Sequence, residues 1–425
     1  MCCNDAVRQY PPTGILSASA RGRLTRLGKA DVKACGAAQA VEQGGWRRDR
    51  GIDALRGLVM ILMALDHTRD FLGASGINPR SSTEPWLFMT RWITHFCAPV
   101  FVFLAGFSTW YSLQKHGRLH LAARQLQLRG LWLVVLELGL VRWGWTFAVG
   151  FQIVLLQALW VLGWGMLALS LLIRWPRQLV VAFGLLLIAS HNLLDPIHAA
   201  SFGSAAWIWA LLHEPQWLVV GSSFKVWILY PLIPWVGVIA IGFGWAPVLA
   251  SKAHNSRFFL AWSGVLLAVF VVLRGTGLYG DPHPWAVQPT LLASLLGFVN
   301  CEKYPPSLLF LLMTLAMMLA AYPLLNRLRG GCGKILVTFG QVPLFFYLLH
   351  VPLIHAVAVL LAAARQQPLG WLFGGFPILQ KPAGYGMPLL AIYGAWLLIL
   401  ALLYPVCGWY CRQKRYRRQW WHWLV

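Results

Sequence analysis

Long runs of apolar residues alternate with short polar segments along the chain from about residue 50 onward. Ten of these runs reach the roughly 20 residues that a helix needs to cross a hydrocarbon core of about 30 Å. We expect membrane-spanning helices at about 54–73, 92–113, 129–149, 151–173, 178–195, 225–247, 257–276, 305–325, 335–364 and 386–408. The pattern predicts an all-α protein, a polytopic bundle of transmembrane helices.

Positive charge is distributed unevenly between the two ends of these spans. If the N-terminus lies in the cytoplasm, most of the 35 Lys and Arg residues fall on the inner side, in the N-terminal tail, the inner loops and the C-terminal segment RQKRYRR. Cytoplasmic loops of membrane proteins carry such an excess of Lys and Arg, so both termini are predicted to be cytoplasmic. The net charge of +22 then reflects topology and contact with membrane lipids, and we expect no binding of nucleic acid.

Composition supports this class and divides the chain into three parts. Hydrophobic residues make up 58% of the chain and charged residues 11%, which lies outside the range of soluble domains. We interpret residues 1–48 as a disordered basic cytoplasmic tail, residues 49–410 as the membrane domain and residues 411–425 as a second basic cytoplasmic tail. The eight cysteines lack metal-binding spacing, so we expect neither a metal site nor a disulfide framework.

Ionisable residues inside the apolar spans are the main functional signal, because a charge at the middle of a membrane costs at least about 2.5–3.5 kcal/mol. Counting about 1.5 Å per residue from the inner end of each span places several of them at roughly 18–25 Å, in the outer third of the membrane. They are Asp66, His67, His95, Arg142, His191, Arg274 and His350. Together they predict a polar chamber that opens outward. For each residue alone, a hydrogen bond to a neighbouring helix is the alternative, and Glu137 is an alternative partner for Arg142.

The first predicted helix places Asp66, His67 and Asp70 on one broad face, since residues three and four apart are helical neighbours. A carboxylate beside an imidazole fixes the tautomer of the ring and raises its basicity, as a general base requires. We therefore predict Asp66 and His67 as catalytic residues and Asp70 as a substrate-binding residue. The alternative is a hydrated helix end in which Arg69 pairs with Asp66 or Asp70.

The stretch RWITHFCAPVFVFLAG, residues 91–106, passes from polar to apolar within a few residues. We expect Thr94, His95 and Cys97 to line the same chamber as Asp66 and His67, because Pro99 loosens the helix beside them. His95 is the second candidate for the catalytic histidine. The alternative is a helix that enters the membrane through the wet headgroup zone.

A polar loop follows Arg274, with the sequence GTGLYGDPHPW. Such a loop on a rigid scaffold is typical of an acceptor-recognition element, and an arginine beside it is suited to bind a carboxylate or phosphate. A solvated loop is the alternative. Arg274 joins Arg142, His191 and His350 as the predicted substrate-binding residues of the chamber.

Several segments carry a resemblance to a known family. They are DALRGLVMILMALDH, RWITHFCAPVFVFLAG, LRGTGLYGDPHPW, NCEKYPPSLLF and FFYLLHVPLIH. Over about residues 49–410, the chain resembles bacterial membrane proteins related to the catalytic domain of heparan-alpha-glucosaminide N-acetyltransferase. The spacing from Arg56 to His67 is also similar to that in the acyltransferase-3 membrane enzymes, where an arginine and a histidine of the first helix are linked to acyl transfer.

The resemblance implies a multi-pass acyltransferase of the bacterial inner membrane. It would move an acetyl or other acyl group from cytoplasmic acyl-CoA, the donor substrate, to a sugar, glycan or other small acceptor on the outer side, without a metal cofactor. Homo-oligomer formation is left open. In the lysosomal enzyme the active histidine lies in the loop after the first helix, whereas the matching loop here, GASGINPRSSTEPWLFMTRW, contains no histidine. Either His67 or His95 has become the base or the chemistry differs, and an acceptor specific to heparan is not implied.

A proton-coupled transporter or flippase is the rival hypothesis. The same buried Asp, His and Arg residues would then form a proton relay and a substrate site. Transporters commonly carry inverted repeats and paired broken helices near the middle of the membrane, and neither is evident in this sequence.

Overall fold

The computed structural model describes residues 49–81, 83–116, 118–221 and 224–416. The predicted N-terminal tail, residues 1–48, and residues 417–425 of the predicted C-terminal tail lie outside the described residues. Two compact units, Met1–Asp49 and Arg50–Val425, are separated by their internal contacts. The second unit is described here by itself.

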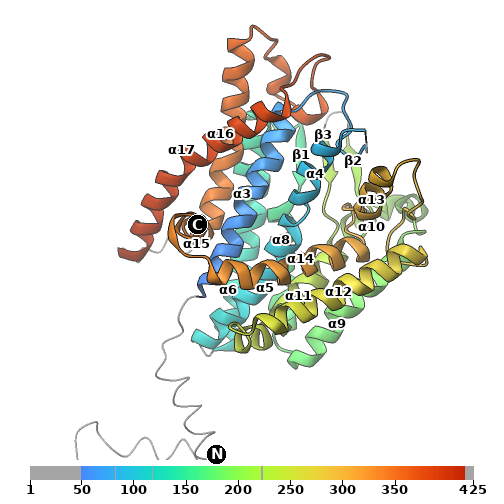
Figure 1. The fold of residues 1–425 in the computed structure, drawn as a ribbon, viewed down its shortest axis with the longest axis vertical. Helices are drawn as coiled ribbons and strands as arrows, with labels where there is room; N and C mark the ends of the chain where they lie inside the picture. The colour runs from blue at the N-terminus through green and yellow to red at the C-terminus, as the bar shows by residue number, and fades with distance from the viewer. Residues whose placement is uncertain (1–48, 82, 117, 222–223, 417–425) are drawn as a thin grey trace, which may run out of the picture. The chain divides into compact units, whose positions relative to one another are not determined.

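This unit is mostly helical (Figure 1). Its α-helices are α3 (Arg50–Leu72), α4 (Pro85–Thr94), α5 (Cys97–His116), α6 (Leu119–Leu136), α7 (Arg142–Thr146), α8 (Ala158–Leu172), α9 (Arg177–Ser190), α10 (Ala206–Leu212), α11 (Leu232–Ser251), α12 (Ser256–Thr276), α13 (Leu291–Val299), α14 (Leu308–Arg327), α15 (Gly330–Gln341), α16 (Pro343–Ala364) and α17 (Leu389–Tyr416). A π-helical turn, η1 (Glu137–Val141), joins α6 to α7, and short 3₁₀ turns follow at η2 (His191–Leu194), η3 (Ala199–Ala205), η4 (Gly370–Leu372) and η5 (Pro377–Leu379).

Among the described residues, seven helical segments are long and apolar enough to cross a membrane, so the protein is a polytopic helical membrane protein. They are Pro85–Gln114, Arg177–Leu194, Leu232–Ser251, Ser256–Thr276, Leu308–Arg327, Pro343–Ala364 and Leu389–Lys414. Each overlaps one of the ten predicted spans, whereas the predicted spans at 54–73, 129–149 and 151–173 have no counterpart among the seven. At 54–73 the reason is charge: α3 has 23 residues, but Arg56, Asp66 and Arg69 interrupt its apolar sequence.

The prediction of an all-α protein is wrong in one region, where the chain forms a three-stranded sheet. The strands β1 (Ile153–Leu156), β2 (Gln216–Val220) and β3 (Phe224–Ile228) are ordered β1-β3-β2, with β3 parallel to β1 and antiparallel to β2. Their residues are mostly β-branched, aromatic or leucine, which favours strands, and a short apolar run does not by itself distinguish a strand from a buried helix. The predicted span 151–173 is therefore β1 followed by α8.

Two further predicted spans are interrupted for local reasons. The span at 129–149 becomes α6, the π turn η1 and α7, which ends where Phe147 takes a left-handed conformation with φ 42°. The span at 335–364 is divided between α15 and α16 at Val342, because the residue before Pro343 is disfavoured in the helical region. Residues 330–334, with the sequence GGCGK, form the first turn of α15.

Close helix contacts at glycines hold α3 in place. A side-chain carbon added at Gly57 of α3 would overlap the carbonyl of Leu336 in α15, and one added at Gly340 of α15 would overlap the carbonyl of Asp53 in α3. Gly106 of α5 packs in the same way against the backbone of α11. Because small residues let two helix backbones approach closely, these contacts fix the positions of α3 and α5, the helices that carry Asp66, His67 and Cys97.

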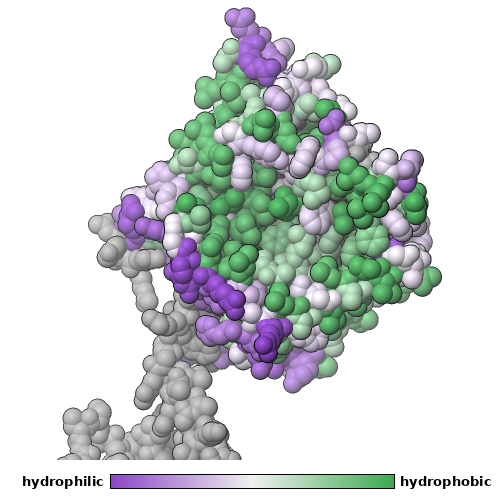
Figure 2. Space-filling model, viewed as in Figure 1, coloured by the Kyte–Doolittle hydropathy of each residue, from purple (hydrophilic) through white to green (hydrophobic). Residues whose placement is uncertain are grey.

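The surface fits a bundle embedded in lipid. Figure 2 shows apolar side chains over a broad area of one face, with hydrophilic side chains gathered toward its upper and lower ends. Exposed large apolar residues lie along the lipid-facing sides of the peripheral helices, among them Leu260, Val265 and Val272 of α12 and Leu397 and Leu402 of α17.

Candidate functional site

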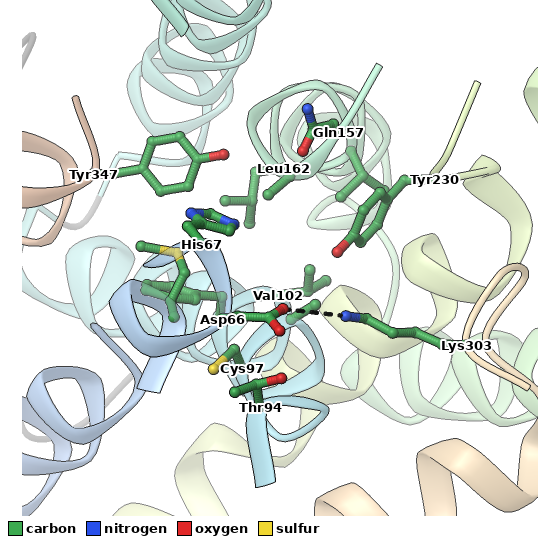
Figure 3. Close-up of a pocket in the computed structure, with 15 residues that line it drawn as sticks. Asp66, His67, Thr94, Cys97, Val102, Gln157, Leu162, Tyr230, Lys303 and Tyr347 are labelled. Carbon is green, nitrogen blue, oxygen red and sulfur yellow. Dashed lines mark ion pairs between the residues drawn. The ribbon is translucent and has the colours of Figure 1, made fainter. Parts of the chain in front are cut away.

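A small cavity lies among α3, α5, α8 and α16, toward the Leu72 end of α3 (Figure 3). Its volume is about 50 Å³, enough for a few water molecules or one small chemical group. Its polar lining residues are Asp66, His67, Thr94, Cys97, Gln157, Tyr230, Lys303 and Tyr347. Apolar residues, Val102 and Leu162 among them, lie between these polar groups (Figure 3). Groups that are far apart in the sequence therefore meet around one space.

The junction between α4 and α5 contributes two of the polar residues, Thr94 at the end of α4 and Cys97 at the start of α5. His95 at this junction keeps right-handed helical dihedral angles (φ −58°, ψ −29°), so a turn a few residues before Pro99 joins the two helices. Thr94 and Cys97 line the cavity, as expected. His95 does not line it: this residue is 2% exposed and packs against Phe310 of α14, with ring centroids 5.4 Å apart. The proposal of His95 as a catalytic base thus lacks geometric support.

Asp66 lies between two cations. Its Oδ1 is 2.8 Å from Nη2 of Arg69, and its Oδ2 is 3.9 Å from Nζ of Lys303. The same Arg69 Nη2 is 2.7 Å from Oδ1 of Asp70. Arg69 therefore pairs with both carboxylates, as the hydrated-helix alternative anticipated, but it is only 8% exposed. Asp70 does not line this cavity and faces a neighbouring pocket instead.

His67 is oriented by a second histidine. Its Nδ1 is 2.8 Å from Nε2 of His350, and the Nδ1 of His350 lies 2.7 Å from the carbonyl oxygen of Tyr347. A carbonyl only accepts hydrogen bonds, so the proton of neutral His350 is on Nδ1 and its Nε2 is an acceptor. His67 must then donate from Nδ1, which leaves its Nε2 with a lone pair. Because His67 lines the cavity, this nitrogen is the one that can accept a proton from a bound molecule.

This arrangement changes the role expected of Asp66. The partner that fixes the tautomer of His67 is His350 of α16, at a sequence separation of 283 residues, while Asp66 pairs with Arg69 and Lys303. Trp145 of α7 packs edge-on against the His67 ring, with centroids 4.8 Å apart. The imidazole is therefore held by a hydrogen bond on one edge and by an aromatic wall, as a positioned base requires.

Lys303 is the main functional candidate that the sequence did not single out. It lies in the short hairpin between α13 and α14, is 7% exposed, and reaches the cavity opposite His67 (Figure 3). Burial disfavours its charge, but the neighbouring Tyr304 and Asp66 outweigh that effect and raise the pKa of Lys303. An ammonium group therefore faces the cavity at neutral pH. In the sequence, Lys303 follows the polar loop after Arg274, for which an acceptor-recognition element and a solvated loop were both open.

Glu137 and Gln157 are two further polar groups at the cavity end of α8. Oε2 of Glu137 accepts hydrogen bonds from the backbone N–H groups of Leu159 and Trp160, 2.7 and 3.1 Å away, so it caps this helix and is not the partner of Arg142. Gln157 directly precedes α8 and is 7% exposed, yet its Nε2 has no hydrogen-bond partner within the described residues. This amide can therefore bind a ligand in the cavity.

The other predicted substrate-binding residues are engaged by backbone carbonyls outside the cavity. Arg142 donates to Ala148 and Gly150, beyond the end of α7. His191 contacts the carbonyls of Ile188 and Pro306. Arg274 donates to four carbonyls, those of His283, Gly297, Phe298 and Asn300. These contacts hold loops in place. Unlike these three residues, His350 contacts a residue that lines the cavity, His67.

A larger pocket adjoins the cavity at the wall formed by Arg69. Its volume is about 730 Å³, within the range of small-molecule sites, and it is bounded by the end of α3, residues 73–79, the start of α4 and residues 378–392. Arg69, Asp70, Glu84, Lys381 and Tyr385 supply its polar groups. Arg69 also pairs with Asp66, so this side chain links the pocket to the groups around the cavity.

Neither thiol chemistry nor a metal cluster is indicated near the cavity. Cys97 and Cys301 are both buried and unpaired, and burial raises the pKa of Cys301 to about 12. Within the described ranges, no group of three or more His, Cys, Asp or Glu residues is arranged to hold a metal ion.

Comparison with known proteins identifies one family. The family model described as heparan-alpha-glucosaminide N-acetyltransferase, catalytic, matches residues 48–278, which is more than half of the chain. No curated protein matches the sequence. The matched residues include Asp66, His67, Thr94 and Cys97, whereas Lys303, Tyr347 and His350 lie beyond the match.

Proposed function

This chain belongs to the heparan-alpha-glucosaminide N-acetyltransferase catalytic family, and from that premise we propose that it is an integral membrane acyltransferase. It transfers an acetyl or other short acyl group from cytoplasmic acyl-CoA to the hydroxyl or amine of a sugar or other small acceptor on the outer side of the membrane. The family implies acetyl-CoA as the donor, whereas a sugar or other small acceptor is our own proposal.

The observation that carries this proposal is the series of contacts from the Tyr347 carbonyl through His350 to His67, from which we infer the tautomer of His67. The backbone of α16 holds the proton of His350 on Nδ1, His350 accepts from Nδ1 of His67, and Nε2 of His67 is left as a base at the cavity. A base positioned in this way takes the proton of the attacking hydroxyl or amine and returns it to the departing thiolate.

The sizes of the two spaces suit different groups of the two substrates. The cavity of about 50 Å³ accommodates an acetyl group, whose methyl would contact Val102 and Leu162 of the lining. The pocket of about 730 Å³ accommodates a saccharide-sized acceptor, with charged groups and Tyr385 available for hydrogen bonds. Acceptor would approach the base past Arg69, which lies in the wall between them.

Release of CoA thiol from acetyl-CoA tests the proposal directly. We would reconstitute the full chain in vesicles, supply acetyl-CoA on one side and a mixture of cell-envelope glycans on the other, and compare the native protein with His67→Gln. We expect release with the native protein and a fall of about 10²- to 10⁴-fold in the variant, the usual contribution of a general base.

An exposed histidine provides the matched control. His198 has a side chain 68% exposed and pairs with Glu214 far from the cavity, so His198→Gln should release CoA at the native rate. The acyltransferase hypothesis fails if the native protein releases no CoA and acetyl-CoA does not raise its thermal unfolding midpoint. Movement of the glycan across the membrane without CoA release would then favour the transporter.

A further inference from the structure

The hairpin that carries Lys303 is clamped by a bidentate ion pair. Nη1 of Arg80 is 3.0 Å from Oε2 of Glu302, and Nη2 of Arg80 is 2.9 Å from Oε1. Two parallel bonds of this kind fix direction as well as distance. Arg80 comes from the segment between α3 and α4, so the ion pair ties that segment to the hairpin across a separation of 222 residues.

The same carboxylate holds the backbone at Lys303. Oε1 of Glu302 accepts the backbone N–H of Lys303 at 3.0 Å and that of Tyr304 at 3.1 Å. Burial disfavours the charge of Glu302, but the hydrogen bonds and charge of Arg80 and these two N–H groups outweigh it and lower its pKa. Glu302 thus remains charged at neutral pH and fixes the direction in which the Lys303 side chain leaves the hairpin.

Asp281 secures the other side of the hairpin. Its Oδ2 accepts the backbone N–H of Glu302 and the hydroxyl of Ser307, both at 2.8 Å, and its Oδ1 is 3.6 Å from Nη1 of Arg274. The side chains of Arg80, Asp281 and Arg274 therefore all restrain this short hairpin. A solvated loop does not need so many fixed polar contacts.

At its other end, Lys303 interacts with Asp66 and Tyr304. Nζ is 3.9 Å from Oδ2 of Asp66, beyond the 2.7–2.9 Å typical of a charge-assisted hydrogen bond, and it lies 5.1 Å from the centre of the Tyr304 ring and hydrogen-bonds to the side chain of that residue. The ammonium group lines the cavity on the side opposite His67 (Figure 3). Its donors are therefore placed where a small molecule between His67 and Lys303 would meet them.

We propose that Lys303 is the catalytic cation of this cavity and that the ion pair between Arg80 and Glu302 is its positioning clamp. The proposal rests on the acyltransferase function. Lys303 stabilises the negative oxygen of the tetrahedral intermediate, while His67 handles the proton on the opposite side.

The chemical step balances with these two groups and the two substrates. The acceptor oxygen or nitrogen forms a bond to the thioester carbonyl carbon as its proton passes to Nε2 of His67. The carbonyl π electrons move to oxygen, whose negative charge faces the Lys303 ammonium. The oxygen then re-forms the double bond, the carbon–sulfur bond breaks, and the imidazolium of His67 returns the proton to the CoA thiolate.

A double-mutant cycle distinguishes this role from a structural one. We would measure kcat, KM and the thermal unfolding midpoint for the native chain, Lys303→Gln, Glu302→Ala and the double variant. Loss of an oxyanion donor costs about 10²- to 10³-fold in kcat, so we expect a fall of that size with Lys303→Gln and a nearly unchanged KM for the donor. Glu302→Ala should lower kcat about 10-fold, and it should have no further effect once Lys303 is absent, because the clamp acts only through that residue.

Glu214→Ala is the control in both backgrounds. This carboxylate also pairs with a basic side chain and accepts a backbone N–H, that of Ala199, but it holds no group at the cavity. It should leave kcat unchanged. If the fold-losses in kcat of the two single variants multiply in the Lys303→Gln Glu302→Ala double variant, Glu302 does not act through Lys303 and the positioning role is refuted. If Lys303→Gln keeps the native kcat, the catalytic role of Lys303 is refuted. If even the native chain releases no CoA, the acyltransferase function itself has failed, a result distinct from both.

Discussion

The pairing of His67 with His350 makes a quantitative prediction for His350→Phe. This substitution keeps an aromatic ring in α16 but removes the Nε2 acceptor that lies 2.8 Å from Nδ1 of His67. A buried N–H left without its partner costs about 1–3 kcal/mol. In the variant this cost falls on the tautomer with its proton on Nδ1 and its lone pair on Nε2, whereas the other tautomer turns its N–H toward the cavity. At about 1.4 kcal/mol for each factor of ten, the active tautomer becomes roughly 5- to 150-fold less favoured.

The assay is steady-state CoA release at saturating acetyl-CoA and acceptor. We expect kcat to fall by roughly that factor in His350→Phe, with little change in KM, because the binding surfaces of the cavity are retained. His350→Gln, whose amide oxygen can accept the same hydrogen bond, should recover part of the loss. His67→Gln should remain the less active protein, since it lacks the base itself. If His350→Phe turns over at the native rate while His67→Gln is inactive, the tautomer argument is refuted.

Three further predictions concern stability and are measured by thermal unfolding of the purified protein. Gly57→Ala forces α3 against the carbonyl of Leu336 and should destabilise the fold by about 1–3 kcal/mol, whereas Gly264→Ala in α12, where the added carbon meets nothing, should not. Glu137→Ala leaves two amide N–H groups at the start of α8 unpaired and should cost at least about 1–3 kcal/mol, and an unchanged midpoint would contradict the capping role. Burial lowers the pKa of Lys381 from 10.5 to about 8, so between these values the unfolded chain holds a proton that the folded protein lacks. The free energy of unfolding should therefore rise with pH in this window, and Lys381→Met should remove that slope.

The helical membrane character followed from hydropathy because each crossing needs about 20 apolar residues, a requirement that sequence displays directly. The sheet did not follow. Ile153–Leu156 and Phe224–Ile228 are as apolar as the helices that flank them, and the pairing of β1 with β3 joins segments about 70 residues apart. Pro343 indicates the helix boundary at Val342, because the residue before a proline is disfavoured in the helical region. Spans placed by hydropathy alone take no account of prolines within an apolar run.

The candidate site was predictable where charge interrupts an apolar helix and not elsewhere. Asp66 and His67 stand out in α3 because buried ionisable groups are costly. The partner of His67 was not evident, since the pairing with His350 depends on how α16 packs against α3. Lys303 was hidden for the opposite reason: in a polar hairpin a lysine is ordinary, and only the contacts of Glu302 and Asp281 show that it is held.

These placements also bear on the missing loop histidine. The loop after α3 offers no histidine, so the base that we propose comes from another element. The matched residues provide His67, but a lone imidazole in an apolar helix has neither a defined tautomer nor a counter-charge for an oxyanion. His350 supplies the first and Lys303 the second, and both lie beyond residue 278. The proposed chemistry therefore requires the C-terminal part of the bundle as well as the matched part, and substitutions at His350 or Lys303 should impair turnover as directly as substitutions in α3.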